Sequence, residues 1–205
     1  MGNRIMIIAG TIALFAVSAF AAPRKNNYGK WINLFNGKDL TGWRMAGKGN
    51  FTVEDHALVT HGGMGLLWYE ERKFRDFKLQ VEWKVNDQCN NSGVFVRFPE
   101  KSDDPWYAVN NGYEIQIDDC DKKGLMFQTG SFYGFHPAAK IASKPAGEWN
   151  RYEITVVDQH YTVVLNGEKV NEFEGERGRE GYIGLQNHDP ISRVSFRRVR
   201  VREIK

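Results

Sequence analysis

The sequence lacks several features that would each define a class of protein. Its 205 residues include only two cysteines, which excludes a disulfide-dense mini-protein and a four-cysteine zinc site. Twenty-eight basic and 25 acidic residues leave a net charge of +3, too small and too dispersed to indicate nucleic-acid binding. There is no glycine-rich nucleotide-binding fingerprint, and no stretch keeps a period of 3.6 residues over three helical turns.

Long apolar runs are also rare, and the one that exists lies at the start of the chain. Arg4 precedes an apolar stretch over residues 5–20, and Ala19-Phe20-Ala21 fits the small-x-small pattern of a cleavage site. A membrane anchor is the alternative, but the run is shorter than the roughly 20 residues of a span. We therefore expect residues 1–22 to be a signal peptide. Residues 23–205 are then one periplasmic or secreted domain without a membrane span.

Export would permit a disulfide between the two cysteines. Cys89 and Cys120 follow the ends of two predicted strands, so they could lie side by side. A bridge would close a loop of about 30 residues and contribute about 3–4 kcal/mol in the chain-entropy model. Two unpaired thiols are the alternative.

Alternation of apolar and polar residues is abundant, and it is the signature of half-buried strands. Leu79, Val81 and Trp83 alternate with charged and amide side chains, and similar patterns occupy residues 94–97, 113–118, 152–157, 161–165, 169–173, 181–185 and 194–204. Asn166-Gly167 predicts a tight hairpin turn. These patterns predict an all-β antiparallel sandwich or jelly roll in one domain. The arginines of residues 193–202 are interpreted as the solvated face of an edge strand, not as a nucleic-acid patch.

Two predicted strands carry polar side chains along one face. Glu114, Gln116 and Asp118 alternate on one strand, and Gln186 and His188 follow the same spacing on another. Side chains at i, i+2 and i+4 share a face, so these groups could form the floor of a polar cleft. A histidine beside amides and a carboxylate can be held in one tautomer for proton transfer. Solvent-facing sheet surfaces also have this pattern, which is the alternative.

Three further residues are candidates for contact with a substrate. Arg97 ends an apolar strand and requires a partner, either a carboxylate such as Glu114 or a substrate oxygen. Trp106 and Tyr133 lie in predicted loops rich in Gly, Asn and Pro, where their rings could stack on a sugar or close the ends of the sandwich.

Seven short motifs in order resemble the 3-keto-disaccharide hydrolase family over residues 31–204. They are NLFNGKDLTGW at 33–43, NSGVFVR at 91–97, GYEIQID at 112–118, TGSFY at 129–133, GEWN at 147–150, LNG at 165–167 and GLQNH at 184–188. The resemblance implies a concanavalin A-like jelly roll of two antiparallel sheets. It also implies cleavage of 3-keto glycosides or 3-keto disaccharides by C2 deprotonation and elimination, with or without later addition of water. In the family pattern a glycine follows the histidine, where this chain has Asp189.

The resemblance also implies roles for the candidate residues. Glu114 and His188 are the expected acid and base, and Arg97 is the expected stabiliser of the developing oxyanion. Gln116, Asp118, Gln186, Tyr133 and Trp106 are expected to bind substrate. A second possibility is that Glu114, Asp118 and His188 hold a divalent cation that polarises the ketone. The substrate would be an oligosaccharide or glycoside oxidised by a separate sugar oxidoreductase.

Two other functions fit parts of the sequence. Laminarinase-like glucanases carry Glu-x-Asp-x-x-Glu on one strand. In this chain Gln116 replaces the Asp of that motif and Asp119 replaces its final Glu. Glu114 and Asp118 would lie about 13 Å apart on a regular strand, too far for a retaining glycosidase. A non-catalytic carbohydrate-binding module is the other alternative, because lectins share the fold.

Overall fold

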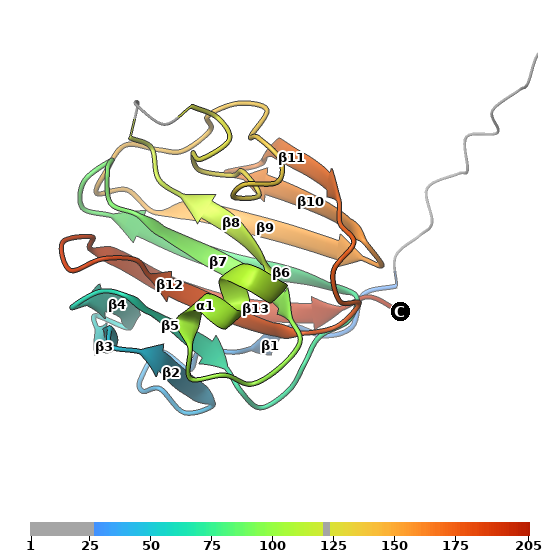
Figure 1. Ribbon diagram of the computed structural model, residues 1–205, viewed down its shortest axis with the longest axis horizontal. Coiled ribbons are helices and arrows are strands. Elements are labelled where there is room, and N and C mark those ends of the chain that lie inside the picture. The colour runs from blue at the N-terminus through green and yellow to red at the C-terminus, as the bar shows by residue number, and fades with distance from the viewer. Residues whose placement is uncertain (1–26, 121–123) are drawn as a thin grey trace, which may run out of the picture.

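The computed structural model describes residues 27–120 and 124–205, and over these residues the chain is a sandwich of two antiparallel sheets (Figure 1). The larger sheet has the order β11-β10-β9-β6-β13-β4-β3, with β1 also paired to β13. Its strands are β1 (Ile32–Asn33), β3 (Asn50–Glu54), β4 (Ala57–His61), β6 (Phe77–Val85), β9 (Asn150–Val157), β10 (His160–Leu165), β11 (Glu168–Glu174) and β13 (Val194–Glu203). The smaller sheet has the order β2-β5-β12-β7-β8, with β2 (Trp43–Gly47), β5 (Gly65–Tyr69), β7 (Ser92–Phe98), β8 (Tyr113–Ile117) and β12 (Tyr182–Asn187). The predicted all-β jelly-roll class is confirmed.

The core lies between the two sheets and uses the apolar half of each alternating strand. Leu79, Val81 and Trp83 of β6 are fully buried, and they belong to the same cluster as Ile115 of β8 and Leu185 of β12. Because successive side chains of a strand point to opposite faces, the polar residues between them lie on the outer faces of the sandwich. The alternation therefore fixes which face of β8 and β12 is available to a ligand.

The C-terminal strand β13 is a central strand, so its prediction as an edge strand was wrong. It pairs with β6 on one side and with β4 and β1 on the other. Alternation identifies the solvated face of a strand but carries no information about how many neighbours the strand has. The hairpin prediction holds: Asn166 and Gly167 join β10 to β11 with positive φ angles of 53° and 92°.

A short helix, α1 (Pro105–Asn111), covers part of the outer face of the smaller sheet (Figure 1). Asp104 caps it by accepting a hydrogen bond from the Trp106 backbone N–H, and Pro105 occupies the first turn, where its missing N–H costs nothing. Ala108 packs on the outward side chains of the sheet, which form a second apolar cluster: Ala46, Leu66, Trp68, Phe95, Phe98 and Tyr182. The sequence pattern predicted a loop here, because one buried alanine in seven residues gives no detectable helical period.

Cys89 and Cys120 form a disulfide with a Cα–Cα distance of 4.4 Å. Cys89 precedes β7 and Cys120 follows β8, so the bond joins the loops at one end of this strand pair. The predicted signal peptide, residues 1–22, lies outside the described residues. Within residues 27–120 and 124–205, no helix has the length and apolar character to cross a membrane.

Candidate active site

A cavity of about 90 Å³ opens on the outer face of the smaller sheet, beside α1. Six of the eight predicted site residues line it: Glu114, His188, Gln116, Gln186, Tyr133 and Trp106, together with Met64, Asn91 and Val109. The floor is built by neighbouring strands, since β7 lies between β8 and β12. Sequence positions that are about 70 residues apart thus meet in one polar cleft.

The register of these strands leaves room for one carboxyl group in the floor. Gly93 of β7 lies opposite Gln116, and Phe95 lies opposite Glu114. Glu114 leans over Gly93 so closely that a Cβ atom there would lie 2.2 Å from the Glu114 Oε1 atom. The absence of a side chain at position 93 is therefore a requirement for this position of Glu114.

Glu114 is a buried carboxyl group with an abnormal affinity for protons. Its side chain lines the cavity, and the residue is only 7% exposed. Burial raises the pKa of Glu114 from 4.5 to about 8, although a hydrogen bond with Gln186 lowers it in part. The group is consequently protonated at neutral pH and available as a proton donor.

The amides of Gln116 and Gln186 surround this carboxyl group. With the Gln116 amide turned to satisfy its neighbours, its nitrogen donates to the Ser92 carbonyl at 2.9 Å and to Glu114 Oε1 at 3.2 Å. Gln186 is buried, and its Oε1 atom has no hydrogen-bond partner within the described part of the chain. A buried acceptor without a partner is costly, so a ligand hydroxyl at this point would be favoured.

His188 lies just beyond β12 and is oriented by the residue that follows it. Its Nδ1 atom is 2.9 Å from Asp189 Oδ2. Asp189 is itself fixed, because its oxygens accept hydrogen bonds from the Ile191 and Ser192 backbone N–H groups and from the Ser192 hydroxyl. Burial acts to raise the pKa of Asp189, but the hydrogen bonds from His188 and Ser192 outweigh it and hold the pKa below its usual value.

Two aromatic side chains form an exposed rim around the cavity. Trp106 of α1 is 53% exposed and Tyr133 is 42% exposed, which is unusual for rings of this size. Tyr133 is held by Phe127, whose ring lies edge-on at 5.3 Å between centroids. Flat apolar rings beside a polar floor are the combination that sugars require, because a sugar has apolar C–H faces and polar edges.

Arg97 is not part of this cavity, and its predicted place at the cleft was wrong. Its positive φ of 65° marks a bulge in β7, where the register with β12 also shifts. The bulge returns Phe98 to the outer face and sends the Arg97 side chain inward. There its guanidinium donates to the backbone carbonyls of Arg75, Asp158 and Gly178 and lies 3.5 Å from Asp76. Arg97 thus stabilises loops at one end of the sandwich.

Asp118 is also buried but does not line the cavity. It follows the last residue of β8, and its Oδ1 atom accepts the Cys120 backbone N–H at 3.0 Å, so it supports the turn that leads to the disulfide. Over the described residues, no group of three or more His, Cys, Asp and Glu side chains is arranged to hold a metal ion. The structure brings Glu114 and His188 to the cavity but does not bring Asp118 there with them.

A family model of the 3-keto-alpha-glucoside-1,2-lyase-like domain matches residues 30–202. The chain belongs to this family. A family relative, the 3-keto-disaccharide hydrolase of Bacteroides thetaiotaomicron, is 27% identical and aligns over 84% of this chain and 78% of its own length. The family resemblance seen in the sequence motifs is confirmed.

Solved structures agree with the fold of the family. A "putative glycosyl hydrolase" from Parabacteroides distasonis superimposes with a TM-score of 0.72 at 25% identity, over 85% of this chain and 94% of that protein. A Bacillus subtilis protein of unknown function with a galectin-like fold superimposes with a TM-score of 0.66 at 16% identity, over 87% of this chain and 98% of its own. The second likeness concerns the fold alone.

Sequence reasoning missed Asn91 as part of this family member's site, and it noted Asp189 only as the carboxylate beside His188. Asp189 is the position at which the chain departs from the family pattern, and the structure shows that its carboxylate orients His188. The alternation of β12 ends before this residue, so strand periodicity could not place it. Asn91 lies just before β7, and only the fold brings its side chain to the cavity wall beside Gln116.

Proposed function

We propose that the chain cleaves 3-keto glycosides by proton abstraction at C2 followed by elimination of the substituent at C1. The observation that carries this proposal is the pairing of two opposite proton-transfer groups in one cavity. Glu114 is a carboxyl group held protonated by burial, and His188 is an imidazole held by a carboxylate. A ketone at C3 acidifies the hydrogen at C2, so this reaction needs one base and one acid at short range.

His188 is assigned as the base. Asp189 can only accept a hydrogen bond when it is ionised, so it selects the neutral tautomer with the proton on Nδ1. The other ring nitrogen, Nε2, is then left with a free lone pair. Because His188 lines the cavity, this lone pair is the group we assign to the C2 hydrogen.

Glu114 is assigned as the acid. In the first step the C2–H bond breaks, its proton moves to His188, and its electrons form an enediolate with the C3 oxygen. In the second step the enediolate electrons form the C1=C2 double bond, the C1–O bond breaks, and Glu114 protonates the leaving oxygen. Water can add to the product afterwards, which makes the net reaction a hydrolysis.

Neutral hydrogen-bond donors would stabilise the developing negative charge. No Lys or Arg lines the cavity among the described residues, so the Gln186 amide and the protonated Glu114 are the groups available. A carboxylic acid kept neutral in an apolar site is an effective donor to such an oxygen. This arrangement replaces the arginine that the sequence had led us to expect.

The size of the cavity limits what it can enclose. About 90 Å³ is well below the roughly 300–1,000 Å³ of a pocket that encloses a drug-sized ligand. We propose that it receives the C1–C3 edge of one sugar and that Trp106 and Tyr133 contact the sugar faces outside it. A conventional retaining glycosidase needs two carboxyl groups about 5–5.5 Å apart. Glu114 is the only Asp or Glu that lines the cavity in the described ranges, which argues against that reaction.

The proposal includes the cellular context predicted from the sequence. The protein would act after export, on a glycoside that a separate oxidoreductase has oxidised at C3. The test is product analysis with a 3-keto disaccharide beside its unoxidised parent, in H₂O and in D₂O, with and without a chelator. Rapid cleavage of the keto compound alone, with deuterium at C2 of the hydrated product, is expected.

Matched variants separate the proposal from its alternatives. Glu114→Gln should abolish turnover while sugar binding persists, because glutamine keeps the shape but cannot release a proton. Cleavage of the unoxidised parent would contradict the proposal and support an ordinary glycosidase. Sugar binding without cleavage of either compound would show a carbohydrate-binding module, and loss of activity with chelator would show that a cation takes part.

A further inference from the structure

A second and larger cavity lies on the opposite side of the sandwich, and the proposed reaction does not use it. Its volume is about 350 Å³, and it is lined by Glu82, Lys144, Trp149, Asn150, Arg151, Asn166 and Arg197. These residues come from β6, β9, β13 and the loops beside them, all in the larger sheet. We call it the Trp149 groove.

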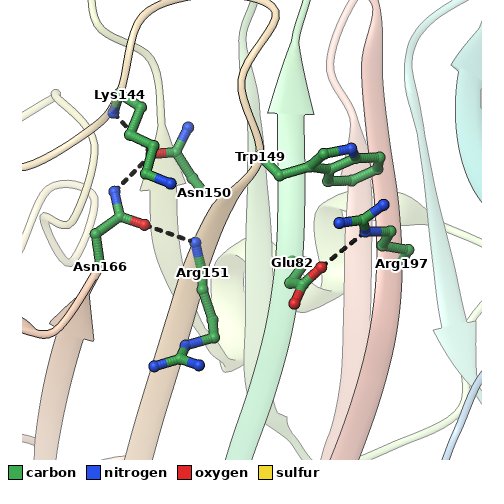
Figure 2. Close-up of a pocket in the computed structure, with 7 residues that line it drawn as sticks. All are labelled: Glu82, Lys144, Trp149, Asn150, Arg151, Asn166 and Arg197. Atoms are coloured by element: carbon green, nitrogen blue, oxygen red, sulfur yellow. Dashed lines mark hydrogen bonds and ion pairs between the residues drawn. The ribbon is translucent and has the colours of Figure 1, made fainter.

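Trp149 forms one end of the groove. Figure 2 shows its indole stacked over the guanidinium of Arg197, which lies 3.9 Å from the ring centroid. Lys84 approaches the same ring at 5.1 Å. Contacts of cations with an aromatic ring are attractive, so Arg197 and Lys84 both favour this position of the indole at the groove.

Lys144, Asn150, Arg151 and Asn166 form the other end (Figure 2). Asn150 is fully buried, and its Oδ1 atom accepts hydrogen bonds from the Lys144 backbone N–H and the Asn166 amide, each at 2.8 Å. Asn166 in turn accepts the Arg151 backbone N–H at 3.0 Å. This network fixes the backbone from which the Lys144 and Arg151 side chains extend.

The groove carries an excess of positive charge. Its one carboxylate, Glu82, is already neutralised, because Arg197 Nε lies at 2.7 Å and Arg198 Nη1 at 3.2 Å. Arg151 shares its partner Glu153 with Lys78, since both cations contact that carboxylate. The cations that line the groove, Lys144, Arg151 and Arg197, therefore outnumber its one carboxylate.

We propose that the Trp149 groove binds an acidic saccharide, in which a uronate carboxylate contacts the cations and a sugar face packs on Trp149. An indole beside cationic and amide donors matches a ring with apolar C–H faces, hydroxyl groups and one negative charge. The volume is within the range of small-molecule sites. A nucleic acid would need a longer track of cations, whereas the whole chain has a net charge of only +3.

The site is separate from the cleft of Glu114, because the two lie on opposite sheets. Its function is then attachment of the protein to an acidic polymer, not turnover. Attachment raises the local concentration of any substrate carried by the same polymer. This inference does not depend on the proposed reaction and can fail or succeed independently of it.

The test is a calorimetric titration of the whole chain with tetragalacturonate and with its carboxyl-reduced, neutral counterpart. We expect the acidic probe to bind and the neutral probe to bind at least about tenfold more weakly, because charged hydrogen bonds are lost. Trp149→Ala should weaken binding about tenfold through loss of the stacking surface. The Lys144→Ala/Arg151→Ala double variant removes two exposed cations and keeps the indole, so it tests the proposal even if Trp149→Ala misfolds.

Arg179→Ala is the matched control. Arg179 has a side chain that is 61% exposed and pairs with Asp158, away from the groove. Its replacement removes one positive charge, as each groove substitution does, but leaves the groove unchanged. Turnover of a 3-keto disaccharide should be unchanged in every variant. The proposal would be overturned if both probes bound equally or if neither bound. It would also be overturned if Arg179→Ala lost as much affinity as the groove variants, or if single-stranded nucleic acid bound more tightly than tetragalacturonate.

Discussion

Replacing Glu114 by glutamine should make the folded protein more stable at alkaline pH, even though it removes a proposed catalytic group. The pKa of Glu114 is raised by burial, so the folded protein favours the protonated carboxyl and resists its ionisation. Glutamine resembles that protonated form in shape and is never charged. The wild-type chain therefore carries a cost that the variant lacks.

The size of this cost follows from the change in pKa. The pKa rises from 4.5 to about 8, and each pKa unit corresponds to about 1.4 kcal/mol, so full ionisation in the folded state costs on the order of 5 kcal/mol. The group is only 7% exposed, so solvent screening is weak. Relative to the variant, the stability of the wild type is greatest below pH 4.5, falls as pH rises, and becomes constant above pH 8. About 3 kcal/mol of this difference should be present at pH 7.

The assay is urea unfolding of both proteins at half-unit intervals from pH 4 to pH 9. The difference between the two free energies of unfolding isolates Glu114, because every other titrating group is present in both chains. A slope of about 1.4 kcal/mol per pH unit between pH 4.5 and pH 8 is expected. A difference that does not vary with pH would show that Glu114 is solvated and would refute the reasoning about its burial.

The remaining predictions concern other parts of the site. Asp189→Asn should lower kcat about 100-fold, with little change in KM, because an amide no longer fixes the His188 tautomer. A rise in KM with an unchanged kcat would contradict this prediction. Gly93→Ala should lower the free energy of unfolding by about 1–3 kcal/mol and reduce turnover, because the new Cβ would displace Glu114. In the control variant Gly178→Ala the new Cβ would meet its nearest atom at 3.4 Å, so neither stability nor turnover should change. Differential scanning calorimetry and kinetics measure the two effects. The Cys89→Ser/Cys120→Ser double variant should lose about 3–4 kcal/mol in urea unfolding, and an unchanged midpoint would refute a native role for the bond.

Strand periodicity predicted much of the candidate site because the site is built on strands. Glu114, Gln116 and Gln186 occupy the non-core face of β8 and β12, and their facing is determined by the burial of Ile115 and Leu185 between them. A period of two assigns such residues to a face without any knowledge of the tertiary structure. Only the pairing of β8 and β12 across β7 had to come from the fold.

Features that break or lie outside the period could not be predicted in this way. The bulge at Arg97 inserts one residue, which reverses the facing of every side chain after it, and the sequence carries no clear signal for that reversal. Asp189 and Trp149 lie in the connections next to strands and not within them. Strand alternation therefore does not assign either side chain to a face of a sheet. Their positions depend on turn geometry and on loop packing against distant strands.

The disulfide near the cavity has a consequence for strand registry. Ser92 pairs with Ile117 at the end of the β7–β8 ladder, and the Cys89–Cys120 bond closes the loops just beyond that pair. A slip of one residue between these strands would turn Glu114 into the core and expose Ile115 to solvent. The covalent link opposes that slipped pairing, because it holds the two chain segments together just beyond the last pair of the correct alignment.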